Sequence, residues 1–337
     1  MSDDLLTLEH VDVGFATDDG QVSAVSDVSL SVAEGEIFGL VGESGCGKTT
    51  LAMAAMGLLP RNATVSGSVR FQGRELVGLA DQDLRRLRGD RISMIYQDPM
   101  TSLDPTFPVG EQVVETIRAH RDVDRAKARE RALALLAGVG IPEPARRFDD
   151  APHRLSGGMR QRVVIATALA NEPALMLADE PTTALDVTIQ AQVLDLLRDL
   201  RKRLWTTIVL ITHDLGVIAQ ICDRVGVMYA GQLVEVAPVA DIFRAPRHPY
   251  TQALLAALPT HEQVRGSLRV IPGRVPNLAD PPPGCRFSTR CPFVMEECAV
   301  VPPLAHESDE HLIACWLSDA TRQAGGQPAR TATGGPA

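Results

Sequence analysis

The sequence has 337 residues, of which 45% are hydrophobic and 22% are charged, as expected of a globular protein with one large domain or two smaller ones. Its formal net charge of −9 argues against sequence-independent binding to nucleic acid, which needs a basic face. No apolar run is long enough to cross a bilayer and residues 1–10 lack a signal-peptide pattern, so we expect a cytosolic protein with reduced thiols.

The first part of the chain predicts strands interrupted by one helix. Short strands are expected within residues 5–41, where aliphatic and β-branched residues are broken by DDG and EG turns. A helix is expected over residues 48–59 and would end before a proline. Two more strands are expected at 66–73 (SGSVRFQG) and 91–97 (RISMIYQ).

The middle of the chain alternates helices and strands. Residues 109–140 and 157–170 show the spacing of amphipathic helices. The nearly all-apolar runs at 174–180 and 206–213 are typical of strands buried on both faces, and a helix is expected between them at 186–204. This alternation predicts an α/β fold with a helical insertion.

Composition divides the chain into three parts. Residues 1–260 hold the alternating pattern and form the predicted α/β domain, with its helical insertion at about 98–172. Residues 261–320 contain a proline-rich run and four of the six cysteines, which predicts a small Cys-rich C-terminal domain. Residues 321–337 predict a disordered tail.

The segment GESGCGKTT, Gly42 to Thr50, follows an apolar strand and opens a helix, which is the context of a phosphate-binding loop. Glycines let backbone N–H groups wrap a phosphate closely, and the helix N-terminus favours negative charge. An ordinary Gly-rich turn would not require the lysine and threonine. We expect Lys48 to reach the β- and γ-phosphates and Thr49 to bind Mg²⁺. The nucleotide-binding residues expected in this loop are Gly42, Ser44, Gly45, Cys46, Gly47, Lys48, Thr49 and Thr50.

The run LMLADE ends in two carboxylates that complement this loop. Its apolar residues predict a buried strand, so Asp179 and Glu180 would lie at the carboxyl edge of the sheet, beside the loop. Asp179 is expected to hold Mg²⁺, and Glu180 is expected to act as general base on the attacking water. The alternative is a solvated acidic strand end with no role in binding. The apolar run before the two carboxylates and Pro181 after them argue against this alternative.

The segment LSGGMRQR, residues 155–162, begins a predicted helix with Ser156 as its N-cap and offers a second anion site. Alone it could be an ordinary capped helix. Its position between the phosphate-binding loop and the acidic strand end makes the sequence resemble the ATP-binding cassette (ABC) family, whose signature is usually LSGGQ. Met159 replaces the glutamine. The resemblance implies that the signature acts in trans, on a second chain, through Ser156, Gly157 and Gly158.

Four further positions match motifs of this family. Gln97 matches the glutamine loop that senses Mg²⁺ and touches the transmembrane partner, and Asp186 in residues 184–186 matches the loop through which two cassettes communicate. His213 matches the switch histidine at the γ-phosphate, although a lone strand-end histidine is more often structural. Phe15 stands where the family stacks a ring on adenine, but it could belong to the core. The resemblance thus implies catalytic residues Lys48, Glu180 and His213, and Mg²⁺ bound through Thr49, Gln97 and Asp179.

The resemblance also implies a fold and an assembly. The implied fold is an ABC-type P-loop ATPase with a RecA-like α/β core, an antiparallel β-subdomain, a helical subdomain and the small Cys-rich C-terminal domain. In this family two cassettes sandwich two ATP molecules, so the loop of one chain acts with the signature of the other. Closure on ATP and opening after hydrolysis drive the membrane partner between two states.

Two segments, residues 96–113 and HPYTQALLAALP at 248–259, narrow the resemblance to the oligopeptide and dipeptide importer ATPases, over about residues 5–317. It implies an ATP-hydrolysing subunit for peptide import, peripheral at the cytoplasmic face of the inner membrane. The implied partners are two permease subunits, a second ATPase subunit that is a paralogue, and an extracytoplasmic solute-binding protein. Nickel or glutathione import is an alternative. A soluble cassette ATPase of translation or DNA repair is another, although those usually carry two cassettes or long coiled coils.

The last feature is a cluster of four cysteines with the spacing C-x5-C-x6-C-x16-C, formed by Cys285, Cys291, Cys298 and Cys315. Clustered cytosolic thiols more often bind metal than form disulfides. A zinc site usually contains a close C-x2-4-C pair, whereas wider spacing suits a [4Fe-4S] cluster with its irons at separate corners. The family resemblance also implies [4Fe-4S], while Zn²⁺ and free or disulfide-bonded thiols are the alternatives. Ligation would supply folding energy that the proline-rich segment lacks, and redox sensing is the other interpretation of its role.

Overall fold

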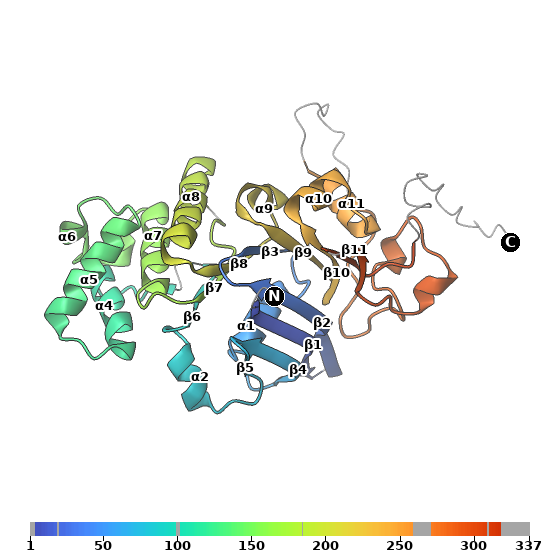
Figure 1. The fold of residues 1–337 in the computed structure, drawn as a ribbon, viewed down its shortest axis with the longest axis horizontal. Coiled ribbons are helices and arrows are strands. Elements are labelled where there is room, and N and C mark those ends of the chain that lie inside the picture. Colours follow the sequence, from blue (N-terminus) through green and yellow to red (C-terminus); the bar gives the residue numbers. More distant parts are fainter. Residues whose placement is uncertain are drawn as a thin grey trace.

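The structure is a computed structural model that describes residues 4–18, 20–98, 102–183, 185–258, 271–308 and 310–317. The predicted domain junction at residues 260 and 261 and the predicted disordered tail at 321–337 lie outside these residues. None of the helices in the described ranges combines the length and the apolar character that a bilayer span requires. Figure 1 shows the sheets in the middle of the molecule, a group of helices at one end and the Cys-rich residues at the other.

An antiparallel sheet contains β1 (Asp4–Thr17), β2 (Gly20–Ala33), β4 (Ala63–Phe71) and β5 (Arg74–Glu75), in the order β2-β1-β4-β5. Val11 of β1 pairs with Val28 of β2, and both side chains are fully buried. The predicted strands are therefore confirmed. The first two are longer than predicted, because polar residues continue each strand on its exposed face.

The second sheet has the order β11-β12-β10-β9-β3-β8-β7-β6. Its parallel strands are β3 (Ile37–Val41), β6 (Ile92–Ile95), β7 (Leu175–Asp179), β8 (Thr207–Thr212) and β9 (Arg224–Tyr229). Every residue of β3, β7 and β8 is buried, as the continuous apolar runs predict. Because parallel strands end at the same edge of a sheet, the segments that follow β3, β6, β7 and β8 meet there.

The predicted helical insertion consists of α4 (Val109–His120), α5 (Arg125–Gly138), α6 (Pro144–Arg147) and α7 (Gly157–Ala168), seen at one end of Figure 1. Phe148 is fully buried among them, and a Cβ on Gly110 would lie 2.1 Å from its ring, so only glycine fits there. Helix α7 ends at Ala168, slightly before the predicted end.

The remaining α-helices in the described part of the chain are α1 (Lys48–Ala55), α2 (Asp81–Leu87), α8 (Val187–Leu204), α9 (Leu215–Ile221), α10 (Val239–Arg244) and α11 (Pro249–Ala256). The predicted helix at 48–59 therefore ends at Ala55. Gly57, with a φ of +62°, turns the chain there, before the proline that was expected to end the helix.

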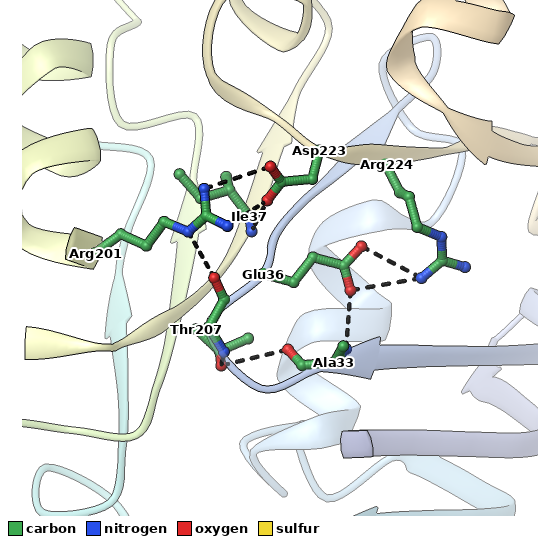
Figure 2. A network of polar contacts seen from close by, with 8 residues as sticks. Ala33, Glu36, Ile37, Arg201, Thr207, Asp223 and Arg224 are labelled. Atoms are coloured by element: carbon green, nitrogen blue, oxygen red, sulfur yellow. Dashed lines mark hydrogen bonds and ion pairs between the residues drawn. The ribbon is translucent and has the colours of Figure 1, made fainter. Parts of the chain in front are cut away.

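Polar contacts tie together the amino-terminal ends of the central strands (Figure 2). Asp223 accepts a hydrogen bond from the N–H of Ile37 (2.8 Å) and forms an ion pair with Arg201 of α8 (3.0 Å). Glu36 forms an ion pair with Arg224 (3.3 Å), and burial raises the pKa of the Glu36 carboxyl. These contacts hold β3, α8 and β9 together at the edge of the sheet opposite the predicted nucleotide site.

The Cys-rich segment, defined here as residues 271–308 and 310–317, continues the second sheet. It contains η2 (Ser288–Arg290), η3 (Glu296–Ala299), β11 (Ala305–Ser308) and β12 (His311–Ile313). β12 pairs with β10 (Gln232–Pro238), which itself pairs with β9. A buried hydrogen bond of 2.8 Å between His311 Nε2 and Glu235 Oε1 joins β12 to β10. The sequence analysis predicts neither the β9–β10 hairpin, whose strands are joined by the short turn at residues 230 and 231, nor the pairing of β10 with β12. The second of these joins strands far apart in sequence, which leave no local periodicity.

Candidate active site

The phosphate-binding loop joins the end of β3 to the start of α1. Lys48 is buried and donates from Nζ to the carbonyl oxygens of Gly42 (2.8 Å) and Glu43 (3.0 Å). A Cβ on Gly42 would lie 2.2 Å from the carbonyl oxygen of Met228, and Gly47 has a φ of +101°. Space at the first position and backbone conformation at the second both require glycine, which confirms the tight turn expected of this loop.

The other predicted loop residues differ in their exposure. Ser44 and Gly45 are exposed at the tip of the loop, whereas Thr50 is half-buried in the first turn of α1. Cys46 is buried, with its Sγ 3.6 Å from Lys48 Nζ. The loop thus holds its lysine beneath an open tip, where a phosphate has access.

Thr49 and Asp179 form the oxygen-rich part of the site. Thr49 Oγ1 donates to Asp179 Oδ2 over 2.8 Å, which brings together the start of α1 and the end of β7. Burial raises the pKa of Asp179, and the hydrogen bond from Thr49 opposes that shift. A hydroxyl and a carboxylate side by side are the hard oxygen ligands that suit Mg²⁺.

Three side chains contact the carboxylate of Glu180. Thr183 Oγ1 and Gln97 Nε2 donate to Oε2 over 2.7 Å and 3.1 Å, and His213 Nδ1 lies 2.9 Å from Oε1. Burial favours the protonated acid, but the hydrogen bonds from Thr183 and His213 outweigh burial and lower the pKa of Glu180. Glu180 is therefore ionised at neutral pH, as a general base must be.

The sheet explains why these residues meet. Gln97, Glu180 and His213 follow β6, β7 and β8, which are neighbouring strands of the second sheet. The structure brings Gln97 and His213 together at the carboxylate of Glu180. Thr183 was not predicted. Its place three residues after Glu180, within the same turn, is the local signal that could have revealed it.

The signature segment lies at the start of α7. Ser156 is exposed, and its Oγ accepts a hydrogen bond from the N–H of Met159 over 3.3 Å, as expected of an N-cap. Gly157 is half-buried, and a Cβ on Gly158 would lie 2.7 Å from Ile189 of α8. The second glycine is thus required where the two helices pack closely.

Asp186 and Phe15 have local partners of their own. Asp186 is the N-cap of α8 and accepts from the N–H of Ile189 over 2.9 Å, while Ala184 lies outside the described residues. Phe15 is half-buried in β1 and packs against the apolar core of the antiparallel sheet. Helix capping and core packing therefore account for part of what these two residues do.

The four cysteines of the Cys-rich segment line one small cavity. Its walls are formed by Cys285, Cys291, Cys298 and Cys315, together with His248, Pro249, Phe287, Phe293, Met295, Pro302, Trp316 and Leu317. Burial raises the pKa of Cys285 to about 11 and that of Cys291 to about 12. All the cysteines are free thiols, and in the described ranges no group of three or more His, Cys, Asp or Glu side chains is arranged to hold one metal ion.

Two family models match the sequence. One is described as ABC transporter and matches residues 25–183, and the other is described as Oligopeptide/dipeptide transporter, C-terminal region, and matches residues 234–298. The second match begins in β10 and includes the first three cysteines of the Cys-rich segment.

Characterised relatives match nearly the whole chain. The dipeptide transport ATP-binding protein DppD of Bacillus subtilis (strain 168) is 47% identical over 318 residues, which cover 94% of this chain and 95% of that protein. The oligopeptide transport ATP-binding protein OppD of Salmonella typhimurium is 48% identical over 312 residues and covers 93% of each chain. Among solved structures, the dimeric post-hydrolysis state of the ATP-binding cassette MJ0796 bound to ADP and Pi is similar with a TM-score of 0.63 and 29% identity, covering 69% of this chain and 98% of that one.

Proposed function

Because this chain belongs to the oligopeptide and dipeptide branch of the ABC transporter family, we propose that it hydrolyses ATP to power the import of peptides. The observation that carries the proposal is the identity of 47–48%, over more than nine-tenths of the chain, to dipeptide and oligopeptide transport ATP-binding proteins. As an ABC ATPase, the chain binds and hydrolyses ATP, and the residues described above supply the chemistry.

Lys48, Thr49 and Asp179 are proposed to bind the phosphates of ATP and their metal. Lys48 turns from the carbonyl oxygens of the loop toward the β- and γ-phosphates, which compete for its ammonium group. The hydroxyl of Thr49 and the carboxylate of Asp179, with Gln97 nearby, fit Mg²⁺ because they are hard oxygen donors. Bound Mg²⁺ supplies charge neutralisation at the phosphates.

Glu180 is proposed to orient the attacking water and accept its proton. Its lowered pKa keeps the carboxylate ionised, and its bonds to Gln97 and His213 fix the carboxylate plane. His213 is proposed to contact the γ-phosphate while it holds Glu180. In the nucleotide-bound state we expect Gln97 to exchange its contact with Glu180 for one with the metal.

The complete site is proposed to need a second ATPase subunit, a paralogue, whose signature covers the ATP bound to this chain. Ser156 supports this arrangement because it lies exposed at the N-terminus of α7 instead of beside Lys48 of its own chain. A similar cassette has been solved as a dimer bound to ADP and Pi. Asp186 and the neighbouring loop would face that second subunit.

The remaining partners are proposed from the function of importers. Two permease subunits would carry the peptide through the membrane, and an extracytoplasmic solute-binding protein would deliver it. This chain would then lie at the cytoplasmic face of the membrane, bound to the permeases. The relatives named for peptide transport support peptides as the cargo.

The four thiols of the Cys-rich segment are proposed to hold a [4Fe-4S] cluster. Four cysteines around one cavity match the number of thiolates that such a cluster requires, and their wide spacing in the sequence suits a cluster better than a zinc site with a close cysteine pair. Ligation would add folding energy to a segment with few aliphatic residues. Anaerobic purification should give a brown protein that contains iron and sulfide in equal amounts and absorbs near ~400 nm. A colourless protein with one zinc would contradict this part of the proposal.

Peptide uptake in living cells tests the function. A strain that lacks this gene should fail to take up a labelled dipeptide or tripeptide, and the wild-type gene should restore uptake. The Glu180→Gln gene, expressed to the same level, should not. Normal peptide uptake in the deletion strain, together with lost uptake of nickel or glutathione, would show that the chain powers the import of that substrate instead of peptides.

A further inference from the structure

Glu43, the second residue of the phosphate-binding loop, is held by residues from the C-terminal part of the chain. Its backbone N–H donates to the hydroxyl of Tyr250, in the HPY segment, over 3.1 Å. Its carboxylate accepts from both terminal nitrogens of Arg290, over 2.9 Å and 3.2 Å. The side chain of Arg290 is 5% exposed and that of Glu43 is 24% exposed, so water screens this bidentate pair little.

The guanidinium of Arg290 is itself fixed by the Cys-rich segment and the sheet. Its Nε donates to the carbonyl oxygen of Pro272 over 2.9 Å, and Nη1 donates to the hydroxyl of Tyr229 over 3.3 Å. Arg290 ends the turn η2 and is followed directly by Cys291. Its position therefore depends on how the segment around the cysteines folds.

A second arginine of the segment reaches the loop through one intermediate turn. Arg286, which follows Cys285, is buried and donates to the carbonyl oxygen of Ala230 between β9 and β10. The next residue, Gly231, donates its N–H to the carbonyl oxygen of Cys46 over 2.9 Å. Two arginines beside the first two cysteines thus support the same loop, one directly and one through the turn.

The contact of Arg290 leads to the part of the loop beside Lys48. Without nucleotide, the carbonyl oxygen of Glu43 accepts from Lys48 Nζ over 3.0 Å, so Glu43 belongs to the stretch of loop backbone from which the ammonium group turns toward the phosphates. We propose that Arg290 is a positioning residue for ATP binding, which acts through Glu43 on the loop and Lys48. The folded Cys-rich segment then raises the affinity for ATP and, by linkage, bound ATP stabilises the segment. This inference rests on the proposed function in one respect, that the loop binds ATP.

The test measures the dissociation constant for Mg·ATP of the purified chain, and the kcat and the KM of the transporter assembled with its second ATPase subunit. Arg290→Ala should raise the Kd and the KM about tenfold while the kcat at saturating ATP stays near that of the wild type. Arg290→Lys should recover part of the affinity, because lysine keeps the charge but loses the bidentate geometry. Glu43→Gln should also raise the Kd for ATP. The double variant, which combines Arg290→Ala and Glu43→Gln, should bind ATP no more weakly than whichever single variant binds it more weakly.

Arg247 offers a matched control. It pairs with Glu307 over 3.3 Å and so also ties the Cys-rich segment to the rest of the chain, at residues outside the phosphate-binding loop. Arg247→Ala should leave the Kd for ATP unchanged. The inference is overturned if Arg247→Ala weakens ATP binding as much as Arg290→Ala, or if Glu43→Gln and Arg290→Lys both bind ATP like the wild type. A wild-type chain that neither binds nor hydrolyses ATP would contradict the proposed function instead. If Arg290→Ala does not fold, the Kd values of the Glu43→Gln and Arg290→Lys variants for ATP decide whether the inference holds.

Discussion

The nucleotide edge and the Cys-rich segment are built in opposite ways. The nucleotide edge, defined by Lys48, Thr49, Gln97, Asp179, Glu180 and His213, lies where parallel strands end together, so each residue is placed by the strand next to it in sequence. The Cys-rich segment has short turns and two short strands, and contacts with distant residues such as Glu43 and Glu235 fix its position. Motifs describe the first region well, whereas the second depends on tertiary contacts.

The comparison predicts that single changes at the nucleotide edge affect chemistry and leave the fold intact. Glu180→Gln should lower kcat about 10²- to 10⁴-fold, because it removes the general base, while the Kd for ATP stays unchanged. Steady-state hydrolysis and equilibrium binding of ATP would measure both quantities. Undiminished hydrolysis would show that another group activates the water, and a large loss of ATP binding would show that Glu180 holds the nucleotide.

Changes in the contacts that hold the Cys-rich segment in place should affect stability more than kcat. Glu235→Ala would leave His311 buried without its hydrogen-bond acceptor, which should lower the free energy of unfolding by about 1–3 kcal/mol. Thermal unfolding and protease cleavage after residue 271 would report this loss. A variant as stable as the wild type would mean that the β10–β12 pairing does not depend on the contact between Glu235 and His311.

The same pair gives a dependence on pH. Burial alone would raise the pKa of Glu235, but hydrogen bonds from His311 and from the backbone of residues 247 and 248 lower it below its ordinary value of 4.5. A carboxyl with a lowered folded-state pKa stabilises the fold fully at higher pH. This stabilisation should therefore disappear as the pH falls from 4.5 through the folded-state value, and Glu235→Ala should unfold with less dependence on pH in that range.

Two helix-capping aspartates allow a further test, with a smaller expected effect. Asp186 caps α8 at the proposed subunit contact, and Asp124 caps α5 in the helical insertion in the same way. Replacing either by alanine should cost about 1 kcal/mol of stability. If Asp186 also serves communication between cassettes, only Asp186→Ala should reduce ATP hydrolysis by the assembled transporter. Equal hydrolysis in the two variants would limit Asp186 to capping.

The smallest expected effect concerns Thr183. Thr183→Val keeps the shape of the side chain but removes the hydroxyl that donates to Glu180, so the pKa of Glu180 should rise. The acidic limb of the pH profile of kcat should then move toward neutral pH, while kcat at alkaline pH stays the same. An unmoved profile would mean that His213 alone determines the ionisation of Glu180.

Local sequence patterns predicted the loop and the acidic strand end of the nucleotide edge, whereas the roles of Gln97 and His213 were predicted from the family resemblance. The all-apolar runs before Glu180 and His213 predicted buried strands, and parallel strands bring their carboxyl ends together. The glycines and Lys48 of the loop were predicted from local sequence too, since their roles follow from the turn that contains them.

The parts that were missed depend on pairing between distant residues. Nothing in the sequence around Arg290 shows that it meets Glu43, and nothing around His311 shows that β12 completes the sheet beside β10. The four cysteines were recognised as a group from their spacing, but the aromatic walls of their cavity come from several separate turns.

The pairing of β12 with β10 has a consequence for how the protein is made. During synthesis, β10 is an unprotected edge strand until about residue 313 has left the ribosome, so its free N–H and C=O groups are open to other chains. The short β11–β12 hairpin then covers that edge. A chain truncated before residue 305 should therefore aggregate through β10 during expression, even though every motif of the nucleotide edge is present in it.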